Sequence, residues 1–378
     1  MSETAVGSIS QHFAQVVDPR VDRTKLHQLL DIISIAICAV VCGADDWVEV
    51  EQFGNDKLEW FRTFLKLPHG IPSHDTFSDV FARIDPDEFE HSFQSWVQTI
   101  ARLLPGEVIA LDGKRLRRSH NHTLGKNAIH MVSAWASSQR LVLGQVKVDE
   151  KSNEITALPA LLQMLALKGC IVSIDAMGCQ SDIAARIIAQ QADYVLALKG
   201  NQGHLLDDVS DLFSTARAVQ FKDVAHDYAK TTDKDHGRLE TRRCWTISAP
   251  SELVYIRDLK DWAELRSVIM LEATRRSGQT TTTEIRYYIS SLTPSAQQAL
   301  SIVRTHWSIE NEVHWVLDVA FREDDCRVRI GHGAQNFAIL RHLALNLLKR
   351  ESSVKVGIKT KRHKAGWSTD YLRKVLST

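Results

Sequence analysis

The sequence lacks any arrangement of cysteines that would hold a fold together or bind a metal. Its six cysteines are scattered over 378 residues, and no two of them form a Cys-x-x-Cys pair. Cys38 and Cys42 lie four residues apart inside an apolar run, as small core residues of a helix do. The chain therefore shows no disulfide framework, and the reducing cytoplasm is the location we expect.

Long hydrophobic runs are also missing. The longest apolar stretch covers residues 32–44, whereas a membrane-spanning helix requires roughly 20 such residues. The stretch lies far from the N-terminus and has no basic flank of the kind found in a signal peptide. We find no internal repeat and no low-complexity segment. We therefore expect a soluble, cytoplasmic protein that does not bind a membrane.

The chain has no net charge, because 46 Lys and Arg balance 46 Asp and Glu. The two ends differ, however. Residues 1–106 contain 8 Lys and Arg against 16 Asp and Glu, whereas residues 341–378 contain 10 against 2. The basic end predicts a C-terminal tail, at residues 351–378, that contacts a polyanion. A tail that only keeps the protein soluble is the alternative.

The first hundred residues predict helices. Apolar residues recur at spacings of three and four between residues 26 and 41, and Gly43 is placed to end that helix. An Asp-Pro pair at residues 85–86 supplies a cap and a first-turn proline for another helix. A Pro-Gly pair at residues 105–106 then ends the helical pattern. We predict an all-helical N-terminal domain at residues 1–105.

From residue 106 onward, short strands alternate with amphipathic helices, which predicts an α/β domain built on a mixed sheet with flanking helices. A β-rich insertion is expected at about residues 203–293, and the domain ends near residue 350. With 44% hydrophobic and 24% charged residues, the chain has the composition of an ordinary globular protein of two or three domains. The core strands are predicted at residues 108–112, 129–135, 141–148, 171–175 and 194–198, with insertion strands at 242–248, 267–274 and 282–290.

Three acidic residues stand out within this domain. Asp112 and Asp175 each end a short apolar run and precede a glycine turn, so we expect each strand tip to carry a carboxylate. Glu310 lies in an aromatic-rich stretch that is predicted to be helical. Singly, an aspartate in such a place is usually a turn residue. Together the three acids predict a site that only the fold can assemble.

Such a site fits phosphodiester chemistry. Cutting or joining a phosphodiester requires charge stabilisation at both the attacking and the leaving oxygen, and two Mg²⁺ or Mn²⁺ ions about 3.5–4 Å apart supply it. Hard cations prefer oxygen ligands. We expect Asp112 to lie between the ions, with Asp175 and Glu310 on either side.

The sequence resembles a known family at five places in order: residues 110–115 (ALDGKR), 173–180 (SIDAMGCQ), 194–202 (YVLALKGNQ), 236–242 (HGRLETR) and 306–324 (HWSIENEVHWVLDVAFRED). The family is the DDE transposases of bacterial insertion sequences, in the group that includes the H-repeat-associated transposases. The resemblance spans nearly the whole chain, including the helical N-terminal region.

The resemblance implies an RNase H-like core in which Asp112, Asp175 and Glu310 match the catalytic, metal-binding triad. It also implies dependence on Mg²⁺ or Mn²⁺ and binding to double-stranded DNA at terminal inverted repeats. Hydrolysis of the DNA would be followed by transfer of a 3′-hydroxyl. A homodimer on DNA is expected from the resemblance alone.

One departure from the family concerns the DNA contacts. Related transposases often carry Arg four residues before the glutamate and Lys seven residues after it, where this chain has His306 and Leu317. The contacts to DNA would then be absent or carried by other side chains. The candidates are Lys114, Arg115, Lys199, Arg238, Arg242, Arg304, His306 and His314.

Two other functions remain open from the residues alone. His306, Glu310 and His314 recur every four residues and would make a zinc hydrolase if they bound one ion, although no HExxH pair is present. A catalytically inactive DNA-binding relic of a transposase is the second alternative. The glycines around Asp112 have neither the spacing nor the Ser/Thr of a phosphate-binding loop, which excludes nucleotide binding there.

Overall fold

The computed structural model of this chain describes residues 9–120, 127–148, 153–235, 238–248 and 253–378. Its centre is a mixed sheet of nine strands in the order β3-β2-β1-β4-β5-β9-β8-β7-β6. The predicted α/β class, a mixed sheet with flanking helices, is confirmed. Parallel pairing joins the three central strands, and β2 and β3 continue the sheet antiparallel on one side. These five are β1 (Val108–Arg115), β2 (His130–Ala136), β3 (Leu141–Val148), β4 (Ile171–Ile174) and β5 (Asp193–Leu198).

The insertion is β-rich, as predicted, but its strands extend the central sheet. The strand β9 pairs antiparallel with β5, with Leu198 opposite Tyr287. The sequence pattern missed the first insertion strand, because its residues are mostly polar and do not alternate. The insertion begins with helix α9 (Gly203–Ala218), followed by β6 (His226–Asp235), β7 (Arg238–Ile247), β8 (Ser267–Ser277) and β9 (Thr280–Ser290).

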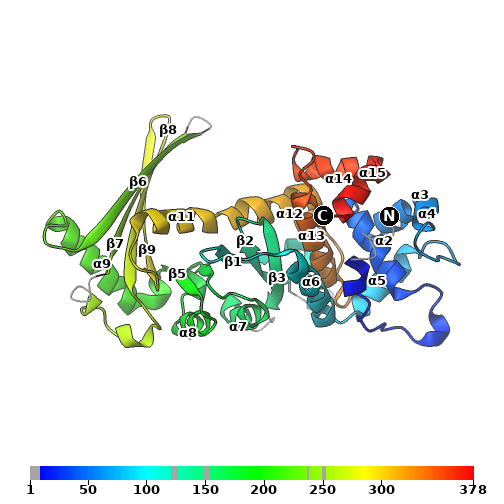
Figure 1. The fold of residues 1–378 in the computed structure, drawn as a ribbon, viewed down its shortest axis with the longest axis horizontal. Coiled ribbons are helices and arrows are strands. Elements are labelled where there is room, and N and C mark those ends of the chain that lie inside the picture. Colours follow the sequence, from blue (N-terminus) through cyan, green and yellow to red (C-terminus); the bar gives the residue numbers. More distant parts are fainter. Residues whose placement is uncertain (1–8, 121–126, 149–152, 236–237, 249–252) are drawn as a thin grey trace.

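Helices cover both faces of this sheet (Figure 1). The helix α11 (Ala296–His306) crosses one face and contacts β1, β4, β5 and the insertion strands, so it spans core and insertion alike. The opposite face is covered by α7 (Glu154–Met164), which packs on β2 and β3, and by α8 (Ser181–Ala189), which packs on β5. The side chains of β4 and those of residues 109–111 in β1 are buried between these layers.

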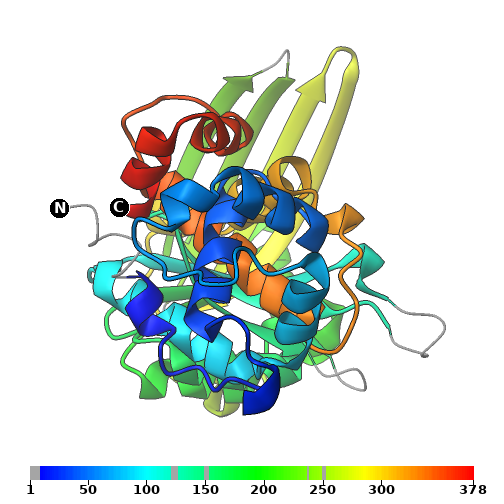
Figure 2. The ribbon, with the colours of Figure 1, turned by 90° about the vertical axis from the view of Figure 1, so that its right-hand side faces the viewer.

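The N-terminal region is helical, as predicted, and it surrounds one long helix from the far end of the chain. That helix, α13 (Gly333–Arg350), is buried along almost its whole length and contacts α2, α5 and α6. Figure 2 shows the N-terminal helices gathered around it, in front of the sheet. Asp85 caps α6 as expected, accepting hydrogen bonds from the amides of Asp87 and Glu88. The N-terminal helices are α2 (Leu29–Val41), α3 (Trp47–Asp56), α4 (Leu58–Phe61), α5 (His74–Arg83) and α6 (Pro86–Ile100).

Residues 351–378 are not a free basic tail, which corrects the sequence-based expectation. They form α14 (Ile358–Trp367) and α15 (Thr369–Leu376), which pack on α13 and on α12 (Trp315–Phe321). Arg362 is buried; its guanidinium donates to the carbonyls of Val40 and Ala44 and pairs with Asp45 at 3.0 Å. Charge alone predicted a basic tail that contacts a polyanion, but two of its cations, Lys361 and Arg362, are buried within the fold.

In the part of the chain that the structure describes, no helix has the length and apolar character that crossing a membrane requires.

Candidate active site

Asp112 lies within a strand, not at its tip. The strand β1 continues to Arg115 because β2 pairs with it beyond the end of β4, with Asp112 opposite Ser133 and Gly113 opposite Val132. The expected glycine turn after Asp112 is therefore wrong. Gly113 has a different role: a methyl group there would overlap the carboxylate of Glu154 and lie 2.7 Å from His130 Nε2.

Asp175 follows β4 directly, as the sequence predicted. Its carboxylate accepts a hydrogen bond from the amide of Met177 at 3.1 Å and so caps the single 3₁₀ turn at residues 176–178. This bond ends the strand and holds the carboxylate at the sheet edge. The turn packs against α7, where Gly178 leaves room for Leu158.

Glu310 is on a helix, but that helix is irregular at this point. After α11 the chain forms one wide turn with π-helical hydrogen bonds at Glu310–His314 and then continues as α12 (Trp315–Phe321). Such wide turns are rare and often occur at functional sites. Figure 1 shows α11 and α12 following one another along the sheet.

The fold brings the three acids together. Asp112, Asp175 and Glu310 line one cavity of about 200 Å³ between the sheet and α11. The remaining polar and aromatic residues of its wall are Ser173, Lys199, Arg286, Tyr288, His306 and Trp307.

The carboxylates repel each other in this cavity. Burial raises the pKa of Asp112 to about 7, and the negative charges of Asp175, Glu154 and Glu310 add to the shift. Burial and Glu154 also raise the pKa of Asp175. A bound cation would relieve this repulsion, so the donor set has the chemistry that a divalent metal requires.

Among the described residues, no group of three or more His, Cys, Asp or Glu side chains already forms a set that could hold a metal ion. The three acids line the cavity without forming such a set, so water and substrate phosphate would have to supply further ligands to a bound ion. The combination considered for zinc does not form a set either. The His306 ring makes a hydrogen bond with the hydroxyl of Ser173 at 3.0 Å, and His314 Nδ1 lies 3.4 Å from Asp112 Oδ2.

Both histidines are only partly exposed, and both are neutral near pH 7. Burial lowers the pKa of His306 to about 4. Burial, together with the nearby Lys114 ammonium, lowers the pKa of His314 to about 4. His306 lines the cavity, whereas His314 lies behind Asp112. Neither presents a positive charge to DNA.

Lys114 does not extend toward solvent, which corrects its assignment as a DNA contact. Its ammonium forms ion pairs with Asp318 and with Glu323, the latter at 2.9 Å, and its side chain is only 11% exposed. Burial works to lower the pKa of Lys114, but the two carboxylates outweigh burial and leave the pKa raised.

The remaining candidate cations lie nearer to solvent. Arg115 is exposed at the end of β1, and Lys199 is exposed beside the cavity, where its charge acts on Asp175. Arg242 and Arg304 both pair with Asp233, at 2.6 and 3.2 Å. Arg238 is in β7, but its side chain lies outside the described residues.

A second cavity, of about 430 Å³, continues from the first. It lies between the insertion strands and α11, and the two share Arg286, Val303 and Trp307. The guanidinium of Arg286 stacks 4.6 Å from the centre of the Trp307 ring. Sequence patterns did not indicate Arg286, because only the pairing of β9 with β5 brings this side chain to the cavity that the three acids line. The cations on its wall are Arg242, Arg275, Arg286 and Arg304.

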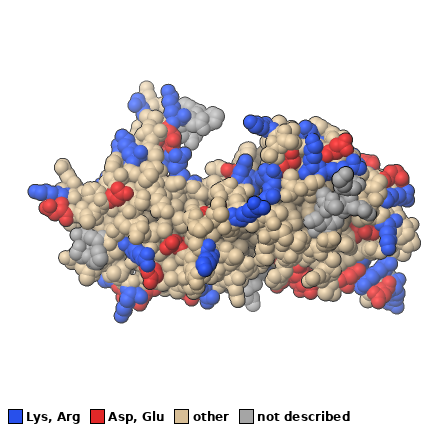
Figure 3. Space-filling model, in the orientation of Figure 1, with Lys and Arg blue, Asp and Glu red and all other residues tan. Residues whose placement is uncertain are grey.

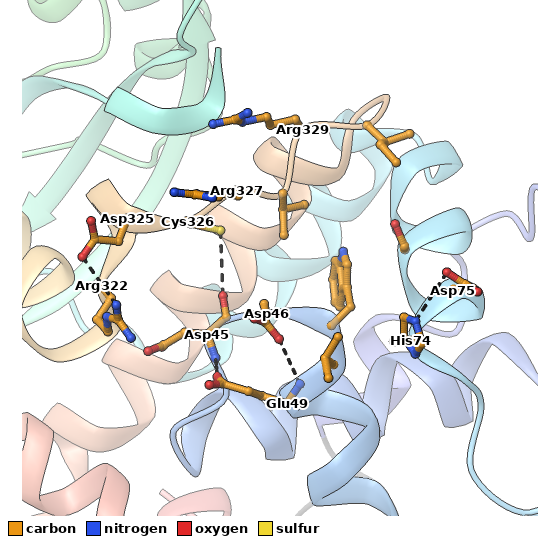
Figure 4. Close-up of a pocket in the computed structure, with 15 residues that line it drawn as sticks. Asp45, Asp46, Glu49, His74, Asp75, Arg322, Asp325, Cys326, Arg327 and Arg329 are labelled. Atoms are coloured by element: carbon orange, nitrogen blue, oxygen red, sulfur yellow. Dashed lines mark hydrogen bonds and ion pairs between the residues drawn. The ribbon is translucent and has the colours of Figure 1, made fainter. Parts of the chain in front are cut away.

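A third cavity, of about 370 Å³, contains none of the three acids (Figure 4). It lies between α3 and α5 of the N-terminal domain and the segment that joins α12 to α13. In Figure 4, Asp45, Asp46 and Glu49 lie on one side of it, and Arg327 and Arg329 on the other. It is therefore separate from the candidate active site.

One solved structure aligns with the whole chain. It is the synaptic complex of the piggyBac transposase with hairpin DNA, which covers 100% of this chain and 79% of that one, with a TM-score of 0.42 and 10% identity.

Comparison with known sequences gives the family. Residues 104–347 match the model described as the Transposase DDE domain, and residues 10–97 match the model described as DDE_Tnp_1-associated. "Putative transposase YncI" of Escherichia coli O157:H7 is 39% identical over 377 residues, which are 99% of this chain and 95% of that protein. "H repeat-associated putative transposase YhhI" of Escherichia coli K12 is 37% identical over 98% of this chain and 97% of that protein. The chain therefore belongs to the DDE transposases, enzymes of the polynucleotidyl transferase class.

Proposed function

We propose that Asp112, Asp175 and Glu310 hold Mg²⁺ or Mn²⁺, two ions in one site, and that the chain cuts DNA and joins DNA strands there. The observation that carries the proposal is the convergence of the three acids on one cavity from two strands and a helix. Nothing in local sequence requires that meeting. The raised pKa of Asp112 supports it, because burial and the neighbouring carboxylates disfavour the ionised form of this side chain, which a bound cation would favour.

The position of each residue at the cavity indicates its proposed role. Bound cations would stabilise charge on the attacking and leaving oxygens of the phosphodiester. Asp112 is the most enclosed of the acids and suits the place between two ions. Lys199 is exposed beside the cavity and is placed to contact a phosphate of the bound strand. His306 stays neutral and hydrogen-bonded to Ser173. It therefore forms part of the cavity wall and does not compete with a metal ion for the carboxylates.

Double-stranded DNA is the proposed partner, bound at terminal inverted repeats by a homodimer. Its path would follow α11 from the first cavity into the second, past Arg286, Arg242 and Arg304. Figure 3 shows the molecule hollowed on this side, between the projecting insertion strands and the C-terminal helices, with Lys and Arg at both margins. Such a reaction belongs in the cytoplasm, and all six cysteines are free, as that compartment requires.

A nicking assay on the DNA that flanks the gene tests the proposal. We expect Mg²⁺-dependent cleavage by the wild type and at least a hundredfold loss, on the order of a lost catalytic electrostatic group, in Asp112→Asn, Asp175→Asn and Glu310→Gln. DNA binding should be retained in all three variants. Full cleavage by any of them would remove that residue from the metal site. DNA binding by the wild type without metal-stimulated cleavage would favour the inactive relic.

A further inference from the structure

We infer that Lys114 is a positioning residue: its ammonium, on a side chain that is only 11% exposed, fixes the helix that carries Glu310 against the strand that carries Asp112. The predicted effect of Lys114 on metal binding rests on the proposed function. Its structural basis is independent of that function.

Lys114 is two residues beyond Asp112 on β1, so the two side chains point to the same face of the sheet. That face is the one that α11 and the following turns cover. The ammonium donates to the carbonyl oxygen of His314 at 3.3 Å and to the carboxylates of Asp318 and Glu323. All three acceptors lie on the segment that follows Glu310.

The place of this contact matters because the segment is irregular. His314 is the last residue of the wide turn that begins at Glu310. A wide turn leaves the helical hydrogen bonds out of their usual register, so its geometry depends on outside contacts. Lys114 supplies one at the carbonyl of His314, and the ring of His314 supplies a second, 3.4 Å from Asp112.

Glu323, one of the carboxylates that bind the Lys114 ammonium, is itself held in place by further contacts. Glu323 is buried, with only 2% of its side chain exposed, and its other oxygen faces Arg341 at 3.7 Å. Arg341 belongs to α13, the helix around which the N-terminal domain is built. The contact therefore joins β1, the Glu310 segment and α13 at one point. Buried ion pairs are weak evidence for added stability, so a role in placing Glu310 accounts better for this one.

The test compares two buried lysines. Lys114→Met keeps the length of the side chain and removes its charge. Because it leaves Asp318 without a partner, the double variant Lys114→Met with Asp318→Asn serves as a second, charge-balanced form that keeps the Glu323–Arg341 pair. Lys361→Met is the matched control, since Lys361 is also buried, donates to the carbonyl of Leu348, and lies in α14.

Two measurements are made on each folded variant: titration with Mn²⁺ alone by calorimetry, and hydrogen–deuterium exchange across residues 306–321. We expect both Lys114 variants to bind Mn²⁺ at least about tenfold more weakly, the effect of losing a group that orients metal ligands. Exchange in residues 306–321 should be faster in both. Lys361→Met should change neither.

Wild-type exchange and wild-type Mn²⁺ affinity in the folded double variant would overturn the inference. If the wild type binds no Mn²⁺, the proposed metal site fails, and the exchange measurement still decides whether Lys114 holds the Glu310 segment. Faster exchange confined to the Lys114 variants supports the inference in that case, and unchanged exchange refutes it.

Discussion

Glu90 is a buried carboxyl in α6, and it makes the stability of the protein depend on pH. Burial raises its pKa to about 8 against the hydrogen bonds from Gln145 and Gln94. One of its oxygens accepts from the amide of Gln145 at 2.9 Å, and the other is buried without a hydrogen-bond partner in the structure. The folded protein therefore keeps the proton on Glu90 at pH values where the unfolded chain has lost it.

The sign of the effect follows from this difference in protonation. A raised pKa in the folded state means that the free energy of unfolding falls as pH rises from the ordinary value of 4.5 to about 8. We expect Glu90→Gln to remove this contribution and to be more stable than the wild type at pH 8, by roughly 1–3 kcal/mol. Urea denaturation across this pH range measures it. Glu59→Gln, at an exposed position, should leave the pH dependence unchanged, and the same profile for Glu90→Gln and wild type would contradict the prediction.

Gly113 is required by its neighbours and not by a turn. Gly113→Ala would push a methyl group into the carboxylate of Glu154, whose Oε1 lies 2.7 Å from His130 Nε2. We expect Gly113→Ala to lower the free energy of unfolding by about 1–3 kcal/mol, the usual cost of overpacking. If the clash is the cause, Glu154→Ala should offset part of that loss in the double variant. Strictly additive losses in a double-mutant cycle would show that the clash is not the cause.

At the scale of elements, some basic side chains of the C-terminal region are buried in packing contacts and others are exposed to solvent. Lys361 and Arg362 are buried. In contrast, Lys355, Lys359 and Lys374 are exposed to solvent, and so is Trp367, at 78%. The exposed lysines are available to neutralise phosphates, whereas Arg373, which is also exposed, pairs with Asp370 at 3.0 Å. We therefore now predict DNA contacts only for these exposed lysines of the C-terminal region, and not for the region as a whole.

Replacing Lys355, Lys359 and Lys374 by Gln should weaken DNA binding and flatten its dependence on salt. The slope of log affinity against log salt should decrease by about 0.9 for each lysine that contacts a phosphate. Titrations at several salt concentrations measure the slope. Gln at three other exposed lysines, Lys66, Lys168 and Lys260, is the matched control. Equal slopes in the two triple variants would refute a specific role for the C-terminal helices.

At the scale of the whole molecule, one hydrophobic core joins the N-terminal helices, the sheet and the C-terminal helices. Residues from both chain ends meet around α13, and Arg362 ties α14 to the end of α2 through the carbonyls of Val40 and Ala44. The N-terminal and C-terminal regions are thus not independent attachments to the catalytic core.

Removing residues 351–378 should therefore destabilise the whole protein and not only reduce its affinity for DNA. Leu372, Val375 and Ala365 are buried in the shared core, and their loss would expose the apolar surface of α13. We expect the truncated chain to melt well below the full-length chain or to aggregate, as judged by circular dichroism. The triple lysine variant above should melt close to the wild type. A truncated chain with an unchanged melting temperature would contradict this account.

The strands and helices were largely predictable because each carries its own local signal. The apolar runs that became β1, β4 and β5 and the Asp-Pro cap of α6 depend only on neighbouring residues. The strand β6 was missed, because its polar residues gain their strand conformation from pairing with β7. The wide turn at Glu310 was missed for a similar reason, since its register is fixed by distant contacts such as Lys114.

The sequence by itself determined the order of the elements, the membership of the family and the three acids to examine. Only the tertiary structure decided which cations are free. Lys114 and Arg362 have the same charge as Lys199 in a sequence, but burial against carboxylates or carbonyls takes the first two out of reach of DNA. Burial and pairing are properties of contacts between distant residues, so no local pattern could separate structural cations from those that remain at the surface.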